Sequence, residues 1–152
     1  LLEIQALVGV TPYPSPRRVT NGVDTSRVLQ ILAVLEKRVG LNLSKQDVYV
    51  NVIGGIDISE PAADLGIAIA ITTCLNDITA DMKTVLIGEI GLSGEIRPVN
   101  DLEKRINEAQ KLGFKRAIVP ASNNIKEKFK NIEVVEVKRI IDAITASIKK
   151  EG

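Results

Sequence analysis

Apolar and polar positions along the first third of the chain predict two strands that are separated by a loop and a helix. Residues 3–8 alternate between apolar and polar side chains with the period of two that is typical of a strand. Residues 48–53 predict a second strand, which ends at a pair of glycines. Residues 11–22 carry three prolines, two arginines and an Asn-Gly pair, so an extended, irregular loop with a turn is expected there.

Two helices are predicted on either side of the second strand. The first is capped by Asp24 or Thr25 and stops at Gly40. The second spans residues 61–75 and is apolar nearly all round, which is typical of a central, buried helix. Its carboxylate, Asp64, lies in the first turn. An ionisable group is therefore expected at the N-terminus of a buried helix. Whether that group is catalytic or structural decides whether the chain is an enzyme or a scaffold.

The second half of the chain alternates strand and helix patterns, which favours an α/β fold. Strands are predicted at 84–87, 116–119 and 132–137, with bent strands between 89 and 97. A helix is expected from a capping box of Asn100 and Glu103 to a left-handed stop at Gly113. A short helix from Ser122 and a last helix over the isoleucines of residues 140–148 complete the prediction.

Composition narrows the function classes for this chain of 152 residues, a length that fits one ordinary domain. Histidine is absent, which excludes Ser-His-Asp and Cys-His catalysis and any histidine-ligated metal. A single cysteine excludes an internal disulfide and a cysteine zinc cluster. Aromatic residues make up 3%, with no tryptophan, which argues against the base-stacking surface of single-strand binders. No long apolar run or leader is visible, so a soluble, cytoplasmic chain with no membrane contact is expected.

Charge is unevenly distributed although the net charge is only +1. Residues 41–102 carry three basic against nine acidic side chains, and residues 103–150 carry twelve against six. Such asymmetry fits an anionic partner, contacts between copies of the chain, or solvated helix faces. Arg17 and Arg18 lie in the proline-rich loop and Arg27 in the first turn of a helix, where the helix dipole disfavours a cation. These three arginines are therefore the candidate DNA or phosphate contacts, with solvent or a subunit interface as the alternative.

Four stretches together resemble the C-terminal domain of the bacterial RadA (Sms) DNA-repair ATPases, which is itself similar to the peptidase domain of Lon. They are EIQALV at 3–8, PRRVTNGVDTSRV at 16–28, AVLEKRVGLNLSKQDVYVNVIGGIDISEPAADLGIAIAI at 33–71 and GEIGLSGEIRPVNDLEKRINEAQKLGFKRAIVP at 88–120. The resemblance implies a two-layer α/β (α+β) Lon-peptidase-like domain of the ribosomal-protein-domain-2-like type. It would cover residues 1–152 as one domain.

The resemblance also implies a parent protein with partners of its own. That parent would be a bacterial, cytoplasmic, DNA-dependent ATPase that drives branch migration in recombination, a homo-oligomer, expected to be a hexameric ring, around single-stranded or branched DNA. Its zinc motif and ATPase core are absent here, and no G-x-x-x-x-G-K-[ST] loop occurs. No cofactor is therefore expected in this chain, and ATP, magnesium and zinc are expected only in the missing parts.

Comparison with Lon peptidases places carboxylates at both positions of the serine–lysine dyad. Asp64-Leu65-Gly66 falls where Ser-Ala-Gly would be, and Glu103 takes the place of the lysine. A carboxylate is a poor nucleophile toward an amide and here has no lysine base. Asp64 is therefore interpreted as capping and orienting its helix, and the chain as a degenerate peptidase that serves as scaffold and DNA contact.

Three alternatives remain open. Asp64 and Glu103 could form an acid–base pair of the kind that hydrolyses glycosides. Ser59 or Ser93 could act with a displaced lysine as a peptidase, although Gly91-Leu92-Ser93-Gly94 is not a nucleophile elbow. The former substrate groove could instead hold a partner peptide without cleaving it.

Overall fold

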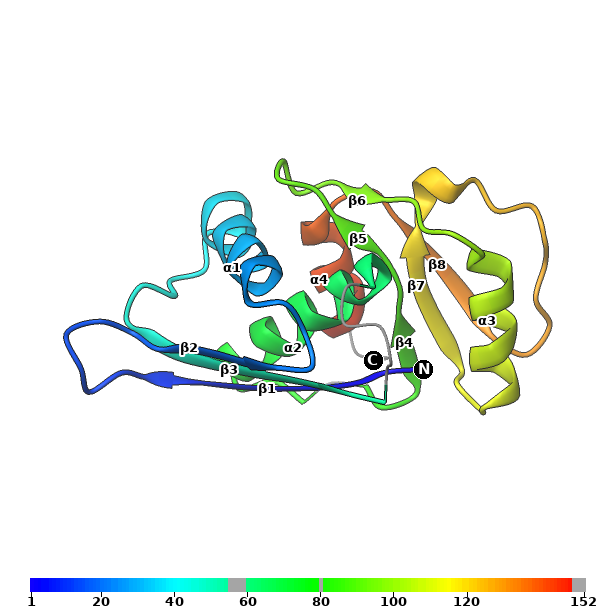
Figure 1. Cartoon of the computed structure of the whole chain (residues 1–152). Helices are drawn as coiled ribbons and strands as arrows, with labels where there is room; N and C mark the ends of the chain where they lie inside the picture. The colour runs from blue at the N-terminus through cyan, green and yellow to red at the C-terminus, as the bar shows by residue number, and fades with distance from the viewer. Residues whose placement is uncertain (55–59, 80, 149–152) are drawn as a thin grey trace.

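The computed structural model of the chain describes residues 1–54, 60–79 and 81–148. These residues form a mixed α/β arrangement of small sheets and helices (Figure 1). The strands are β1 (Glu3–Val10), β2 (Arg18–Asn21), β3 (Gln46–Ile53), β4 (Thr84–Leu86), β5 (Glu89–Ile90), β6 (Ile96–Arg97), β7 (Arg116–Pro120) and β8 (Glu133–Val137). The α-helices are α1 (Thr25–Val34), α2 (Asp64–Leu75), α3 (Leu102–Lys111) and α4 (Ile140–Ile148). Short turns of other helix types are η1 (Leu35–Val39), η2 (Pro61–Ala63) and η3 (Ala121–Asn123).

Two three-stranded sheets and a short hairpin organise the strands. The first sheet has the order β1-β3-β2, with β1 antiparallel and β2 parallel to β3. The second has the order β4-β7-β8 and is parallel throughout. The hairpin pairs β5 with β6 and lies in the chain between β4 and β7 of the second sheet. The prediction of an α/β fold is confirmed at this level.

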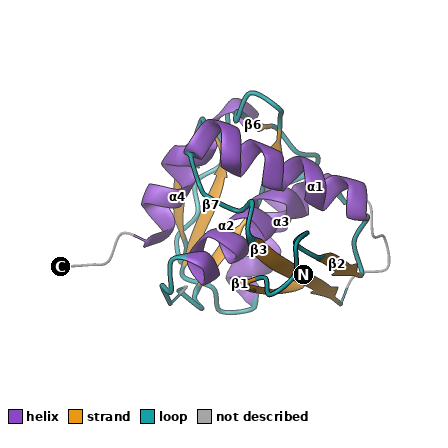
Figure 2. Ribbon diagram, turned by 90° about the vertical axis from the view of Figure 1, so that its left-hand side faces the viewer, coloured by secondary structure: helices purple, strands orange, loops and turns teal. Residues whose placement is uncertain are grey.

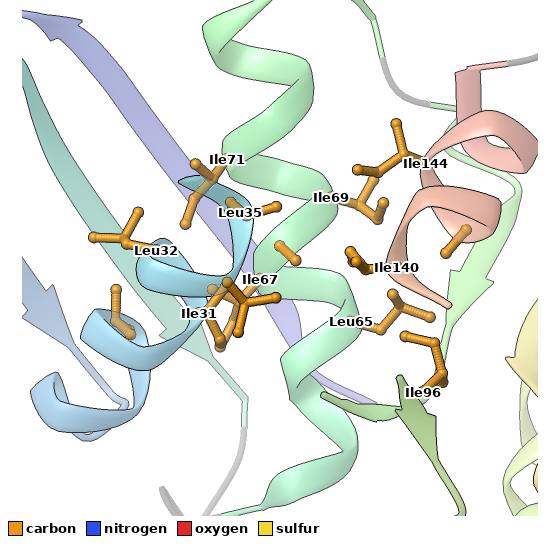
Figure 3. Packing of buried hydrophobic residues seen from close by; sticks show 14 of the residues in the cluster. Ile31, Leu32, Leu35, Leu65, Ile67, Ile69, Ile71, Ile96, Ile140 and Ile144 are labelled. Atoms are coloured by element: carbon orange, nitrogen blue, oxygen red, sulfur yellow. The ribbon is translucent and has the colours of Figure 1, made fainter. Parts of the chain in front are cut away.

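Helix α2 is the centre of the larger core, as its apolar sequence predicts. It contacts β1, α1 and α4, and its residues from Asp64 to Ile69 are all buried. Figure 3 shows isoleucines and leucines of α1, α2 and α4 that point toward one another across this core. A methyl group on Gly66 would lie 2.8 Å from Cδ1 of Ile4, so the absence of a side chain there lets α2 approach β1 closely.

A second, smaller cluster lies between α3 and the parallel sheet. Its buried members include Leu102, Ile106 and Ala109 of α3 together with Ala117 and Val119 of β7. The periodicity of the helix predicts this inward face. Figure 1 shows α3 packed beside β7 and β8, at the opposite end of the molecule from the loop that joins β1 to β2.

Several predicted helix ends are confirmed. Asp24 caps α1 by accepting a hydrogen bond from the backbone N–H of Ser26, and Gly40 follows η1 with a φ of 89°. Gly113 has a φ of 95° and ends the segment after α3. These positions are set by local chemistry, since a carboxylate accepts from free N–H groups and glycine tolerates positive φ.

Two local predictions are wrong. The segment 11–22 is not all loop, because β2 pairs in parallel with β3 and completes the first sheet. The expected capping box of Asn100 and Glu103 does not form: α3 begins at Leu102, after a left-handed Asp101 whose side chain makes no cap. A different contact links α3 to the residues before it: Nε of Arg105 donates to the backbone carbonyl of Asn100 at 2.8 Å. The predicted helix from Ser122 is the single turn η3.

Candidate functional site

Asp64 is the first residue of α2, and its carboxylate is paired with an arginine from a different helix. Nε of Arg27 donates to Oδ1 at 2.5 Å and Nη2 donates to Oδ2 at 2.7 Å. The backbone N–H of Ile90 donates to Oδ2 at 3.0 Å. The Asp64 side chain is 2% exposed, so these three donors replace the water that the carboxylate has lost.

Arg27 bridges two carboxylates from its place in the first turn of α1. Its Nη2 lies 3.4 Å from Oε2 of Glu89, at the start of β5, in addition to its contact with Asp64. One guanidinium therefore ties together α1, α2 and β5. Its side chain is 26% exposed, which leaves one side of the cluster open to solvent.

The pKa values of Asp64 and Arg27 are both raised, but by different main causes. Burial raises the pKa of the Asp64 carboxyl, and the hydrogen bonds from Arg27 and Ile90 oppose that rise. The Asp64 hydrogen bond raises the pKa of Arg27, against the effect of burial. An arginine that donates two hydrogen bonds to one carboxyl group is the arrangement found with an ionised carboxylate, so Asp64 and Arg27 form an ion pair. Burial disfavours the charged form of Asp64 and so opposes this pairing.

The space beside this pair is too small for a substrate. A cavity of about 10 Å³ is lined by Arg27, Asp64 and Ile90 together with apolar residues of α1. That volume is about what one water molecule needs. Within the described part of the chain, the cluster is thus a structural junction without room for a substrate.

Asp64 and Glu103, the two residues that the resemblance to Lon peptidases assigns to the dyad, are not hydrogen-bonded to each other. Glu103 lies half-buried in the first turn of α3, and none of the hydrogen bonds or ion pairs of Asp64 involves it. The acidic neighbour of Asp64 is Glu89. The interpretation of Asp64 as a cap is wrong in its detail: it makes no side-chain cap on α2 but binds Arg27 and Ile90 across the fold.

Ser93, one of the two serines named from sequence, makes no hydrogen bond to Asp64 or Arg27. Ser93 is exposed, its N–H donates to the carboxylate of Glu95 and its carbonyl accepts from Arg139. No lysine donates to it among the described residues. Ser59 falls outside the described residues.

Arg17 and Arg18, at the entry to β2, contact groups other than those of Arg27. The backbone N–H of Arg17 donates to Asp47 at 2.7 Å, and its guanidinium lies 3.4 Å from the same carboxylate. Arg18 donates to the backbone carbonyls of Gln46 and Leu43. The compensating anion that sequence reasoning sought outside the chain for Arg27 lies inside it, as Asp64.

Two further residues at this end were missed by sequence reasoning. The Arg17 guanidinium lies over the ring of Tyr13, 4.6 Å from its centroid, and 5.9 Å from that of Tyr49. No short-range pattern signals the contact with Tyr49, because Tyr49 belongs to β3 and meets Arg17 only through strand pairing.

Two other kinds of feature, a metal-binding cluster and a membrane-spanning helix, are absent from the part of the chain that the structure describes. There, no three His, Cys, Asp or Glu side chains come together in a way that could hold a metal ion. Within the same ranges, none of the helices has the length and apolar character needed to cross a membrane.

Comparison with known proteins supports the resemblance drawn from the motifs. A family model described as subunit ChlI of Mg-chelatase matches residues 21–123, about two thirds of the chain. The chain belongs to this family. It is also a homologue of proteins named DNA repair protein RadA: it is 49% identical over 148 residues to that of Synechocystis sp., 47% over 149 residues to that of Bacillus subtilis and 44% over 145 residues to that of Escherichia coli.

The alignments cover the two partners unequally. They span 97%, 97% and 95% of this RadA homologue but only 29%, 32% and 32% of the three relatives. The chain therefore spans about a third of the length of the relatives that it matches.

Proposed function

We propose that this RadA homologue is a non-catalytic Lon-peptidase-like domain that serves as scaffold and DNA contact in a longer bacterial protein of recombinational DNA repair. Residues 1–152 would form one domain of the two-layer, ribosomal-protein-domain-2-like type. The longer protein would be a cytoplasmic, DNA-dependent ATPase that assembles as a ring and drives branch migration. ATP, magnesium and zinc would bind to its other parts.

The observation that carries the non-catalytic assignment is the pairing of Asp64 with Arg27. Peptide hydrolysis by a dyad needs a nucleophile that a neighbouring base deprotonates. At the dyad position of this chain the polar partners are a guanidinium and a backbone N–H, both of which stabilise a carboxylate and neither of which accepts a proton. The group is therefore suited to holding elements together.

A scaffold role is supported by what this junction connects. Arg27 on α1, Asp64 on α2 and Glu89 on β5 come from three separate stretches of the sequence. These ion pairs hold α1 and β5 in fixed positions against the central helix α2. A domain held rigidly in this way can serve as a building block of a larger assembly.

DNA contact is proposed for Arg17, Arg18 and Arg27 with unequal support. The side chain of Arg17 is 51% exposed and its contact with Asp47 is long, at 3.4 Å, whereas Arg18 and Arg27 make shorter hydrogen bonds to oxygen atoms of the chain. Arg17 is therefore the strongest of the three candidates, and the name of the relatives gives DNA as the partner to test.

Two experiments test the proposal. A casein or peptide hydrolysis assay should show no cleavage by the native chain, nor by an Asp64→Ser/Glu103→Lys variant, because Glu103 is not among the partners of Asp64. Cleavage that Ser93→Ala abolishes would instead establish a peptidase with a displaced dyad. Fluorescence anisotropy with labelled single- and double-stranded oligonucleotides should show binding that weakens steeply with salt and weakens further in Arg17→Ala.

A further inference from the structure

The first sheet has one face that the rest of the described chain leaves open. Residues alternate along β1 and β3, and one set, which includes Ile4, Ala6, Val48 and Val50, packs into the core. Helices α1 and α2 lie on that side of the sheet (Figures 1 and 2). The alternate set points away, and no described helix or strand covers it.

This outer face holds an unusual share of the exposed apolar side chains. Eleven large hydrophobic residues are exposed among the described residues. Four of the eleven lie on this face or on the loop at its end, namely Leu7, Tyr13, Val19 and Ile53. Apolar patches of this kind mark binding surfaces more often than free solvent faces.

Strand pairing arranges the outer face in chemically distinct rows. Leu7 of β1 and Val19 of β2 both pair with Tyr49 of β3, which gives an apolar row across the three strands. Two residues further along, Gln5 and Asn21 both pair with Asn51, which gives a row of three side-chain amides. On the other side of the apolar row lies Arg17, stacked between Tyr13 and Tyr49.

The charged group that is exposed at the Arg17 end of this face is a cation. Arg17 pairs with Asp47, but the Asp47 side chain is 7% exposed while that of Arg17 is 51% exposed. The arginine is therefore presented to a ligand and the carboxylate is not. Lys45, whose carbonyl accepts from the N–H of Thr11, is exposed at the same end.

We propose that the outer face of the β1-β3-β2 sheet binds single-stranded DNA, with bases on the Leu7–Tyr49–Val19 row and phosphates at Arg17. The inference rests on the DNA contact proposed above and gives it a surface and a mode. A nucleobase needs a flat apolar or aromatic platform for its face, donors and acceptors for its edge and a cation for its phosphate. The sheet supplies all three, with the apolar row in the middle, the amide row on one side of it and Arg17 on the other.

The low aromatic content argues against a stacking surface only if the aromatic residues are scattered. The chain has two tyrosines and no tryptophan, and both tyrosines flank Arg17. Their position also gives a direct probe, because all tyrosine emission of the protein comes from this site.

The test is a titration of the 152-residue chain with an oligonucleotide of about 12 thymidines, with tyrosine emission and anisotropy read together. An abasic oligomer of the same length, which keeps the phosphates and lacks the bases, serves as the control ligand. We expect the thymidine oligomer to bind and quench the emission, and the abasic oligomer to bind more weakly without quenching. Tyr49→Thr should weaken binding of the thymidine oligomer by about 5- to 100-fold, and Tyr49→Phe should keep it.

A charge-reversed variant at the far end of the molecule is the matched control. Lys126→Glu/Lys128→Glu alters two exposed cations on the loop that follows η3, and it should leave the quenching intact. Binding of both oligomers without quenching, lost in this variant, would overturn the inference and leave the proposed DNA contact standing elsewhere. No binding of either oligomer at low salt would overturn both. Dimers or larger assemblies that Leu7→Lys dissociates in sedimentation would assign the face to a second copy and overturn the inference.

Discussion

Replacing Arg27 with methionine removes the cation from the buried junction and leaves the Asp64 carboxylate in place. Methionine keeps most of the apolar stem of the side chain, so the apolar contacts of this side chain change little. The carboxylate then retains one hydrogen bond, from the N–H of Ile90. The variant therefore asks how much the junction depends on its counter-ion.

The expected loss is about 3 kcal/mol of unfolding free energy, because removing one partner of a buried ion pair strands the other charge. The lower end of the usual range of roughly 3–5 kcal/mol is appropriate here because the Arg27 side chain is 26% exposed and water can reach the gap. Asp64→Asn should cost less, about 1–2 kcal/mol, because the amide oxygen still accepts hydrogen bonds and Arg27 keeps Glu89. The double variant Arg27→Met/Asp64→Asn should recover most of the stability that Arg27→Met loses, because no charge is left stranded.

Urea unfolding followed by far-ultraviolet circular dichroism measures the three variants against the native chain. For a chain of this size, 3 kcal/mol corresponds to a thermal midpoint lower by about 6–12 °C. The loss should also depend on pH. Burial already raises the pKa of Asp64, and removing Arg27 raises it further above the unfolded value of about 3.9. The deficit should therefore be absent below about pH 3.9 and should grow as the pH rises through the folded pKa.

Two results would refute this reasoning. Equal losses in Arg27→Met and Asp64→Asn would mean that the carboxylate does not depend on the arginine for its charge. A loss in Arg27→Met that is the same at acid and neutral pH would mean that packing, and not the stranded charge, accounts for it.

Two further perturbations follow from single contacts. Gly22→Ala should destabilise the fold by about 2 kcal/mol or more, because φ is +78° and the new methyl group would lie 2.0 Å from the carbonyl oxygen of Val52. The control, Gly9→Ala, places its methyl group where no atom lies within 4 Å, so its effect should stay within about 0.5 kcal/mol. Thermal unfolding of the two variants compares these losses. Asp47→Asn should lower the thermal midpoint at neutral pH and lose that effect in acid, because the N–H of Arg17 holds the pKa of Asp47 below its usual value. The stabilisation is present above about pH 3.9 and is lost as the pH falls through the folded pKa, so a midpoint difference that persists unchanged at low pH would contradict it.

The sequence alone determines the features of this protein that depend on neighbouring residues. The central burial of α2 follows from a helix that is apolar all round, the cap of α1 from Asp24 and the stop after α3 from Gly113. Each depends on contacts within a few positions, which periodicity and turn chemistry describe. The resemblance to RadA proteins is of the same kind, because it rests on ordered motifs.

Tertiary structure alone decided which distant groups meet. Strand β2 is stable because Arg18–Asn21 pair with residues about 30 positions later in β3, and a four-residue segment after three prolines shows no period of its own. Asp64 finds its partner 37 residues earlier in Arg27, so its role as one end of an ion pair could not be read from its own helix. Long-range pairing is fixed by how the elements pack, and the sequence near each residue does not encode it.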